Sequence, residues 1–190
     1  MFNRDQFIAD LKSARAEADN HLASKEIMER AFADPAAIIN ELGAPSPETF
    51  GPLYQSDELT ILNAVWAPEM CLRPHNHNMW AVIGIYEGRE DNVYWRRIKD
   101  DPRGRIETAG AKDLGKGDVV PLGAEIIHSV FNPARKFAGA LHVYGGNFFD
   151  EPRSEWDPEA RTEQPYDLEA NMAHFAEENA RWKDVATKSA

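Results

Sequence analysis

The sequence predicts a mainly β protein, a barrel or jelly roll with short helices before it and one helix after it. Between about residues 50 and 149, short runs rich in Val, Ile, Trp, Tyr and Phe alternate with turn signals such as Asp101-Pro102. On either side of this region, apolar residues recur at helical spacing instead. Many short, closely spaced strands are typical of antiparallel sheets that close into a barrel or jelly roll.

Residues 1–48 form the predicted helical segment. A first helix is expected from Asn3 to about His21, because apolar residues recur there every three or four positions. A second helix is expected from Ser24. A third has Asp34 as its cap and Pro35 at its first position, and it ends at Gly43.

Residues 49–150 hold the predicted barrel. The expected strands are Leu59–Trp66, Asn78–Tyr86, Asn92–Ile98, Arg105–Thr108, Asp118–Pro121, Ile127–Phe131 and Phe137–Tyr144. Residues 151–190 are predicted to be an acidic loop through Pro165 and then a helix. This helix carries Leu168, Met172, Phe175 and Trp182 on one face and is expected to pack on the outside of the barrel. We interpret residues 1–190 as one domain, since a chain of this length can bury one sizeable core.

Composition and charge exclude several classes of function. The formal net charge of −11 disfavours nucleic acid and anionic membranes as partners. The single cysteine, Cys71, excludes an internal disulfide. The sequence has no apolar run that could span a bilayer and no recognisable secretory signal, so a cytoplasmic protein is expected. A small molecule or a protein, which includes a second copy in a homodimer, remains as the partner.

Three histidines are the candidate metal ligands. In a strand, His75 and His77 point to the same side, close enough to bind one ion. His128 lies on another predicted strand, and barrel closure could bring it opposite this pair. Three neutral imidazoles leave coordination positions open, and the uncompensated charge of a divalent ion favours an anionic ligand.

These residues resemble the two motifs of the cupin family. The first is the His-x-His strand, here His75-Asn76-His77, and the second is Pro121-Leu122-Gly123 followed by His128-Ser129-Val130-Phe131-Asn132. The resemblance implies a cupin-type jelly-roll barrel, a double-stranded β-helix. Many cupins add a glutamate ligand after His-x-His, but the segment Asn78-Met79-Trp80-Ala81-Val82 has no carboxylate.

Within the cupins, the sequence is similar to the thiol dioxygenases typified by cysteine dioxygenase. Trp66 precedes His75 at a similar distance, and Leu141-His142-Val143-Tyr144 resembles that family's His-x-Tyr pair. The resemblance implies an iron(II) cofactor, molecular oxygen as a second substrate and a small thiol that is oxidised to a sulfinate. It also implies that His142 and Tyr144 hydrogen-bond the substrate or oxygen.

Several residues depart from that pattern. The family's carboxylate-binding arginine lies upstream of the tryptophan, but Leu53-Tyr54-Gln55-Ser56-Asp57 has no arginine. Arg73 is a candidate replacement, because its two-residue offset from His75 would place it on the ligand-bearing face. The family's serine beside the pair is Ala140 here, and no cysteine follows His77 to crosslink with Tyr144.

Two other classes of function stay open. A cupin could use zinc, manganese or nickel as a Lewis acid in isomerisation, decarboxylation or hydrolysis. It could also bind a metal or a small ligand without turnover. At the level of single residues, His142 and Tyr144 could be an ordinary interior pair, and Arg73 could be a structural arginine paired with a carboxylate.

Overall fold

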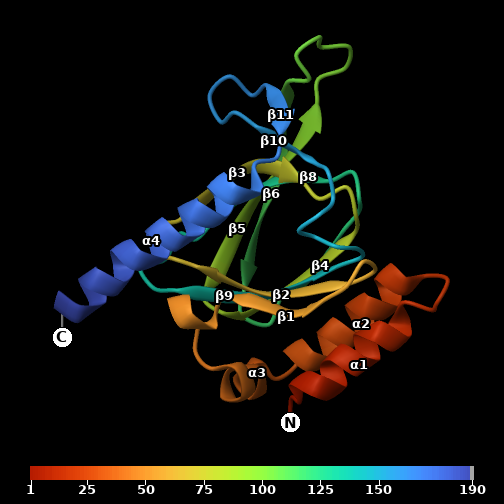
Figure 1. The fold of residues 1–190 in the computed structure, drawn as a ribbon, viewed down its shortest axis with the longest axis vertical. Coiled ribbons are helices and arrows are strands. Elements are labelled where there is room, and N and C mark those ends of the chain that lie inside the picture. The colour runs from red at the N-terminus through yellow and green to blue at the C-terminus, as the bar shows by residue number, and fades with distance from the viewer. Residues whose placement is uncertain (189–190) are drawn as a thin grey trace.

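The structure is a computed structural model that describes residues 1–188, and the side chains of residues 1–182 (Figure 1). The helices are α1 (Arg4–Ala14), α2 (Asn20–Phe32), α3 (Pro35–Leu42) and α4 (Leu168–Lys188), with a 3₁₀ turn, η1 (Pro47–Thr49). The strands are β1 (Gly51–Gln55), β2 (Thr60–Trp66), β3 (Cys71–Asn76), β4 (Ala81–Glu87), β5 (Arg89–Arg97), β6 (Ile106–Gly115), β7 (Val119–Leu122), β8 (Ile127–Phe131), β9 (Ala138–Tyr144), β10 (Ser154–Trp156) and β11 (Glu163–Pro165).

The strands form two antiparallel sheets that face each other. One sheet has the order β1-β2-β9-β4-β7 and the other the order β11-β10-β3-β8-β5-β6. Figure 1 shows β2 and β9 on one side of the interior and β3, β5 and β8 on the other. This is a jelly roll of the cupin type with helices at both ends, so the predicted fold class is confirmed.

The central strands are buried on both faces, which explains their continuous apolar sequences. Along β9, Leu141 and Val143 point towards α1, α2 and α3 and belong to the core beneath those helices. Ala140 and Tyr144 alternate with them and belong to the core between the two sheets. The same strand therefore anchors the helical layer and lines the interior.

Polar caps begin two of the N-terminal helices. The side chain of Asn3 accepts a hydrogen bond from the backbone N–H of Gln6 at 2.8 Å, and Asp34 caps α3 as the sequence predicts. The predicted bounds of the first two helices are wrong. The first helix ends at Ala14 rather than near His21, and the second begins at Asn20.

The segment after the barrel differs from its prediction in two ways. The acidic stretch expected as loop contains β10 and β11, and β10 extends the second sheet by pairing Glu155 with His75 of β3. The helix α4 does not pack on the outside of the barrel. Its residues Leu168, Met172 and Phe175 line a cavity between the sheets, so the helix closes the open edge of the jelly roll. Among the described residues, no helix is long and apolar enough to cross a membrane.

Helix α2 packs on strand β4 through a close contact that requires a glycine. A Cβ atom on Gly84 would lie 2.6 Å from the ring of Phe32. Gly84→Ala is therefore expected to lower the free energy of unfolding by about 1–3 kcal/mol, because the ring has to shift in a packed core. Denaturant titration measures this. Gly110→Ala is the control, since a Cβ there meets nothing within 4 Å. Equal unfolding free energies for both variants would contradict the prediction.

Candidate metal centre

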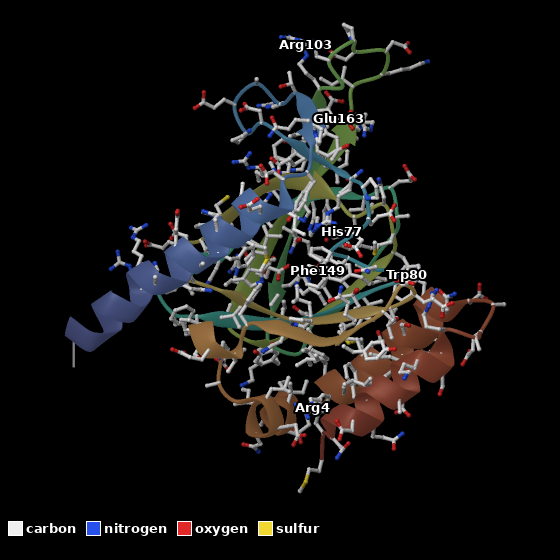
Figure 2. The ribbon with its side chains drawn as sticks, in the orientation of Figure 1. Arg4, His77, Trp80, Arg103, Phe149 and Glu163 are labelled. Atoms are coloured by element: carbon white, nitrogen blue, oxygen red, sulfur yellow. The ribbon has the colours of Figure 1, made fainter. Side chains whose placement is uncertain are left out.

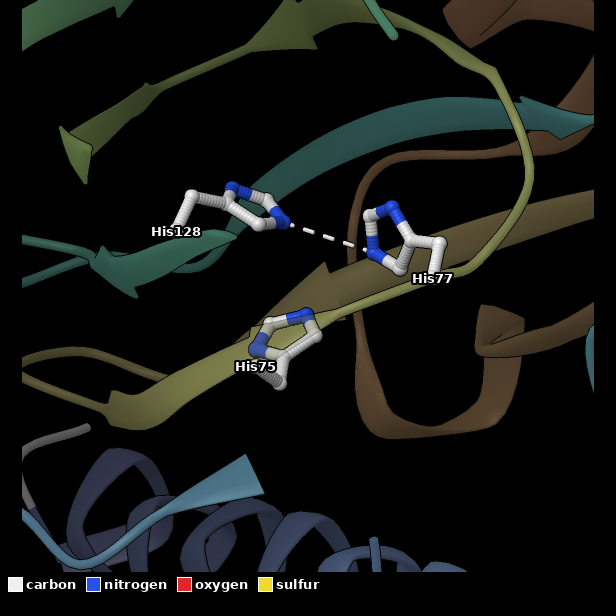
Figure 3. Close-up of side chains that lie close together, drawn as sticks. All are labelled: His75, His77 and His128. Carbon is white, nitrogen blue, oxygen red and sulfur yellow. Dashed lines mark hydrogen bonds between the residues drawn. The ribbon is translucent and has the colours of Figure 1, made fainter. Parts of the chain in front are cut away.

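The fold brings His75, His77 and His128 together inside the jelly roll. His75 lies on β3 directly opposite His128 of β8, and His77 follows the end of β3. One ring nitrogen of each residue lies within 4.8 Å of the others, and all three side chains are buried (Figure 3). The three candidate ligands thus converge on one point, as the sequence predicts.

Hydrogen bonds on the outer side of two rings orient them. Nδ1 of His75 lies 2.9 Å from the carbonyl oxygen of Arg73, and Nδ1 of His128 lies 2.7 Å from Oδ1 of Asn92. Both oxygens can only accept, so both Nδ1 atoms donate, and in each of these two neutral rings the Nε2 atom carries the lone pair. Nε2 of His128 faces Nε2 of His77 at 3.4 Å. These donors fit a divalent metal ion.

Burial keeps the three imidazoles neutral. It is the main cause that lowers the pKa of His75 to about 4 and the pKa values of His77 and His128 well below their usual range. The neighbouring imidazoles add to the effect on His77 and His128. Neutral imidazole is the form that binds metal.

This pKa shift predicts that the metal-free protein loses stability in acid. The unfolded chain binds a proton at His75 near pH 6.5, whereas the folded chain does so only near pH 4. The free energy of unfolding should therefore fall as the pH drops through this window, by roughly 3 kcal/mol for this histidine. Urea titration of the metal-free protein across the window measures it, and His75→Gln should make the dependence shallower, because only the contributions of His77 and His128 remain. An unfolding free energy that stays constant across the window would contradict the assignment.

The histidines open into a small cavity with mostly apolar walls. Its aromatic lining is Phe50, Trp66, Tyr144, Phe148, Phe149, Tyr166 and Phe175. Figure 2 shows His77 and Phe149 between the two sheets. The space open to the centres of water-sized molecules is about 40 Å³. That is room for roughly three waters or one small ligand.

His142 and Tyr144 line the same cavity as the candidate ligands. Nδ1 of His142 and the hydroxyl of Tyr144 are 2.9 Å apart, and the Tyr144 ring lies 5.0 Å from the ring of His77. The pair thus lies on one strand face, as expected, and its catalytic role stays a prediction.

Arg73 does not lie on the ligand-bearing face, so that part of its prediction is wrong. Its guanidinium donates to Glu155 at 2.9 Å and the side chain is 43% exposed, outside the cavity. The pairing of β3 with β8 shifts register between Leu72 and His75. This irregularity reverses the alternation, so Leu72 rather than Arg73 points inward with His75.

The sequence interpretation missed two polar residues of β5. Glu90 and Asn92 are both buried, and they connect the candidate ligand His128 to the pair of His142 and Tyr144. A signal was available, because strand alternation places positions 90 and 92 on one face.

A buried arginine beside the cavity was also missed. The guanidinium of Arg153 lies over the rings of Phe148 and Tyr166, at 4.2 and 3.9 Å, and both rings line the cavity. Its Nη1 donates to the carbonyls of Phe148 and Glu151, while Nε and Nη2 are buried and have no hydrogen-bond partner among residues 1–182. Among the described residues, Arg153 has no ion-pair contact with a carboxylate. Such a group is suited to bind an anion.

No protein-family model matches the chain. Its fold is similar to oxalate decarboxylase from Bacillus subtilis, with 22% identity over 50% of this chain and 23% of the other, at a TM-score of 0.39. A tryptophan-to-phenylalanine variant of that decarboxylase shares 18% identity over 58% of this chain and 25% of the other, at a TM-score of 0.39. Peruvianin-I, a cysteine peptidase from Thevetia peruviana latex, shares 17% identity over 47% of this chain and 51% of the other, at a TM-score of 0.38.

The chain therefore spans about a quarter of the oxalate decarboxylase chains and about half of the peptidase. Similarities over so small a part of these proteins do not indicate which reaction this chain catalyses. The three-histidine cluster fits the metal site of a cupin.

Proposed function

We propose that the protein is a non-haem iron(II) dioxygenase that oxidises a small anionic thiol to a sulfinate. One observation carries the proposal: three neutral histidines and the His142–Tyr144 pair open into one small cavity. Iron(II) held by His75, His77 and His128 would supply open positions where a thiolate and molecular oxygen meet. Both oxygen atoms of O₂ would bond to the sulfur of the thiolate, and the sulfinate that results accounts for every atom and for the charge.

The other residues of the cavity have roles that follow from their contacts. The Tyr144 hydroxyl, which His142 positions, can hydrogen-bond the substrate or oxygen. The aromatic walls exclude water from the reacting sulfur. The buried guanidinium of Arg153 favours a substrate with a carboxylate, because two of its nitrogens make no hydrogen bond to the described side chains or backbone.

Oxygen uptake tests the proposal directly. The protein is loaded with iron(II) under nitrogen and mixed with oxygenated buffer that contains 3-mercaptopropionate, cysteine or cysteamine. We expect thiol-dependent uptake with the two carboxylated thiols, and a sulfinate product detected by mass spectrometry. Absence of uptake with all three thiols would overturn the proposal. Conversion of a thiol under nitrogen, with no oxygen added, would instead support Lewis-acid chemistry, in which zinc, manganese or nickel could replace iron.

A further inference from the structure

Glu90 is a buried carboxylate with one oxygen that has no full hydrogen bond. It lies on β5 and is 0% exposed, and its Oε1 accepts from Nδ2 of Asn92 at 3.0 Å. Its Oε2 lies 3.4 Å from Nε2 of His142, and neither atom has another partner in the part of the chain that the structure describes. Among the described residues, His142 is its only ion-pair contact. A carboxylate held out of water in this way is costly unless it has a function or a partner.

Glu90 is part of a continuous polar chain across the site. Asn92 is fixed at both ends, since its Oδ1 accepts from the ligand His128 and its Nδ2 donates to Glu90. On the other side of Glu90, His142 contacts Tyr144 through Nδ1 at 2.9 Å. The imidazole therefore has the carboxylate at one nitrogen and the tyrosine hydroxyl at the other. Hydrogen bonds of catalytic relays are often long in ligand-free structures, which the 3.4 Å contact fits.

We propose that Glu90 takes up the proton that the substrate thiol loses when it binds, by way of Tyr144 and His142. This rests on the proposed function, because it requires a thiol in the cavity. The S–H bond breaks and its proton passes to the Tyr144 oxygen, while the Tyr144 proton moves to Nδ1 of His142. The Nε2 proton of His142 moves to Oε2 of Glu90. The substrate thiol thus becomes a thiolate and the Glu90 carboxylate becomes a carboxylic acid, with no oxidation or reduction.

The charge balance of the buried site favours this transfer. One buried negative charge, on Glu90, disappears as another, on sulfur, enters, so the net charge of the site stays constant. The other titratable groups that face Glu90 are His142, Tyr144 and Tyr94. Glu90 acts through His142 and Tyr144, so it is a positioning residue that also stores the proton.

A count of released protons tests the proposal without turnover. Iron(II)-loaded protein is titrated under nitrogen with 3-mercaptopropionate in two buffers of different ionisation enthalpy, by isothermal calorimetry. The wild type should release close to no proton to the solvent, and Glu90→Gln about one proton per thiol bound, because the amide cannot accept it. Tyr144→Phe, which interrupts the relay at its other end, should also release about one proton per thiol.

Glu155→Gln is the matched control, because Glu155 is another carboxylate that is 1% exposed, but it bonds Arg73, Gln164 and Asn171 instead. It should behave as the wild type does. Equal proton release by the wild type and Glu90→Gln would overturn the relay and leave the proposed function standing. Absence of any thiol binding to the iron-loaded wild type would overturn both.

Discussion

Replacing His128 with alanine is expected to abolish tight metal binding. The side chain supplies one of three converging nitrogens, and its Nδ1 bond to Asn92 holds the ring in place. Loss of a residue that only orients a ligand already costs about 10–100-fold in metal affinity, so loss of a ligand should exceed about 100-fold. Iron per chain, measured by plasma emission spectroscopy after dialysis under nitrogen, should fall from near one to near zero.

His174→Ala is the control for this change. His174 lies on α4, where its Nε2 is 2.9 Å from the carbonyl oxygen of Cys71, away from the candidate ligands. Its removal should leave the iron content unchanged. If His128→Ala retained iron with wild-type affinity while remaining folded, the three-histidine assignment would be wrong.

Replacing Arg153 with glutamine is expected to change which thiols the protein accepts. A charged hydrogen bond contributes about 1.5–3 kcal/mol, so kcat/KM for 3-mercaptopropionate should fall about 10–150-fold. Cysteamine has no carboxylate, so any activity with it should change little. Steady-state oxygen uptake with the two thiols measures the ratio.

Arg73→Gln is the control variant, because strand alternation predicts that Arg73 binds the substrate carboxylate. Arg73 pairs with Glu155 outside the cavity, so its loss should leave the ratio between the two thiols unchanged. If Arg73→Gln lowered the preference for 3-mercaptopropionate over cysteamine and Arg153→Gln did not, Arg73 rather than Arg153 would be the residue that binds the carboxylate.

The fold and the histidine cluster could be predicted because their signals are local. The strands between Leu59 and Tyr144 show β-branched and aromatic runs with turn residues between them, and His75 and His128 lie within two of those strands. The position of His128 opposite His75 follows from the antiparallel pairing of β3 and β8. Local pattern and tertiary pairing agree at these positions.

Arg73 was misplaced because the register shift in β3 leaves no plain mark in the sequence. Simple alternation puts residues 73 and 75 on one face, and the irregularity between Leu72 and His75 breaks that rule. Pro74, which cannot donate to a neighbouring strand, lies at this point and is the one hint that the sequence holds.

Glu90 and Arg153 were missed because their surroundings look exposed. Glu90 stands in the charged run Arg89-Glu90-Asp91, where only the alternation along β5 separates the buried glutamate from its neighbours. Arg153 lies in the acidic stretch predicted as loop, and its burial comes from Phe148 and Tyr166, which long-range folding brings to it. Alternation along β5 is the one local signal for Glu90, and the contacts of Arg153 have no local signal.

Anomalous diffraction at the iron edge, from crystals grown under nitrogen with iron(II), tests the metal centre most directly. We expect one strong peak at roughly 2.0–2.2 Å from a ring nitrogen of each of His75, His77 and His128, with Glu90 outside bonding distance. A peak that is absent, or that is bonded to other residues, would contradict the three-histidine centre.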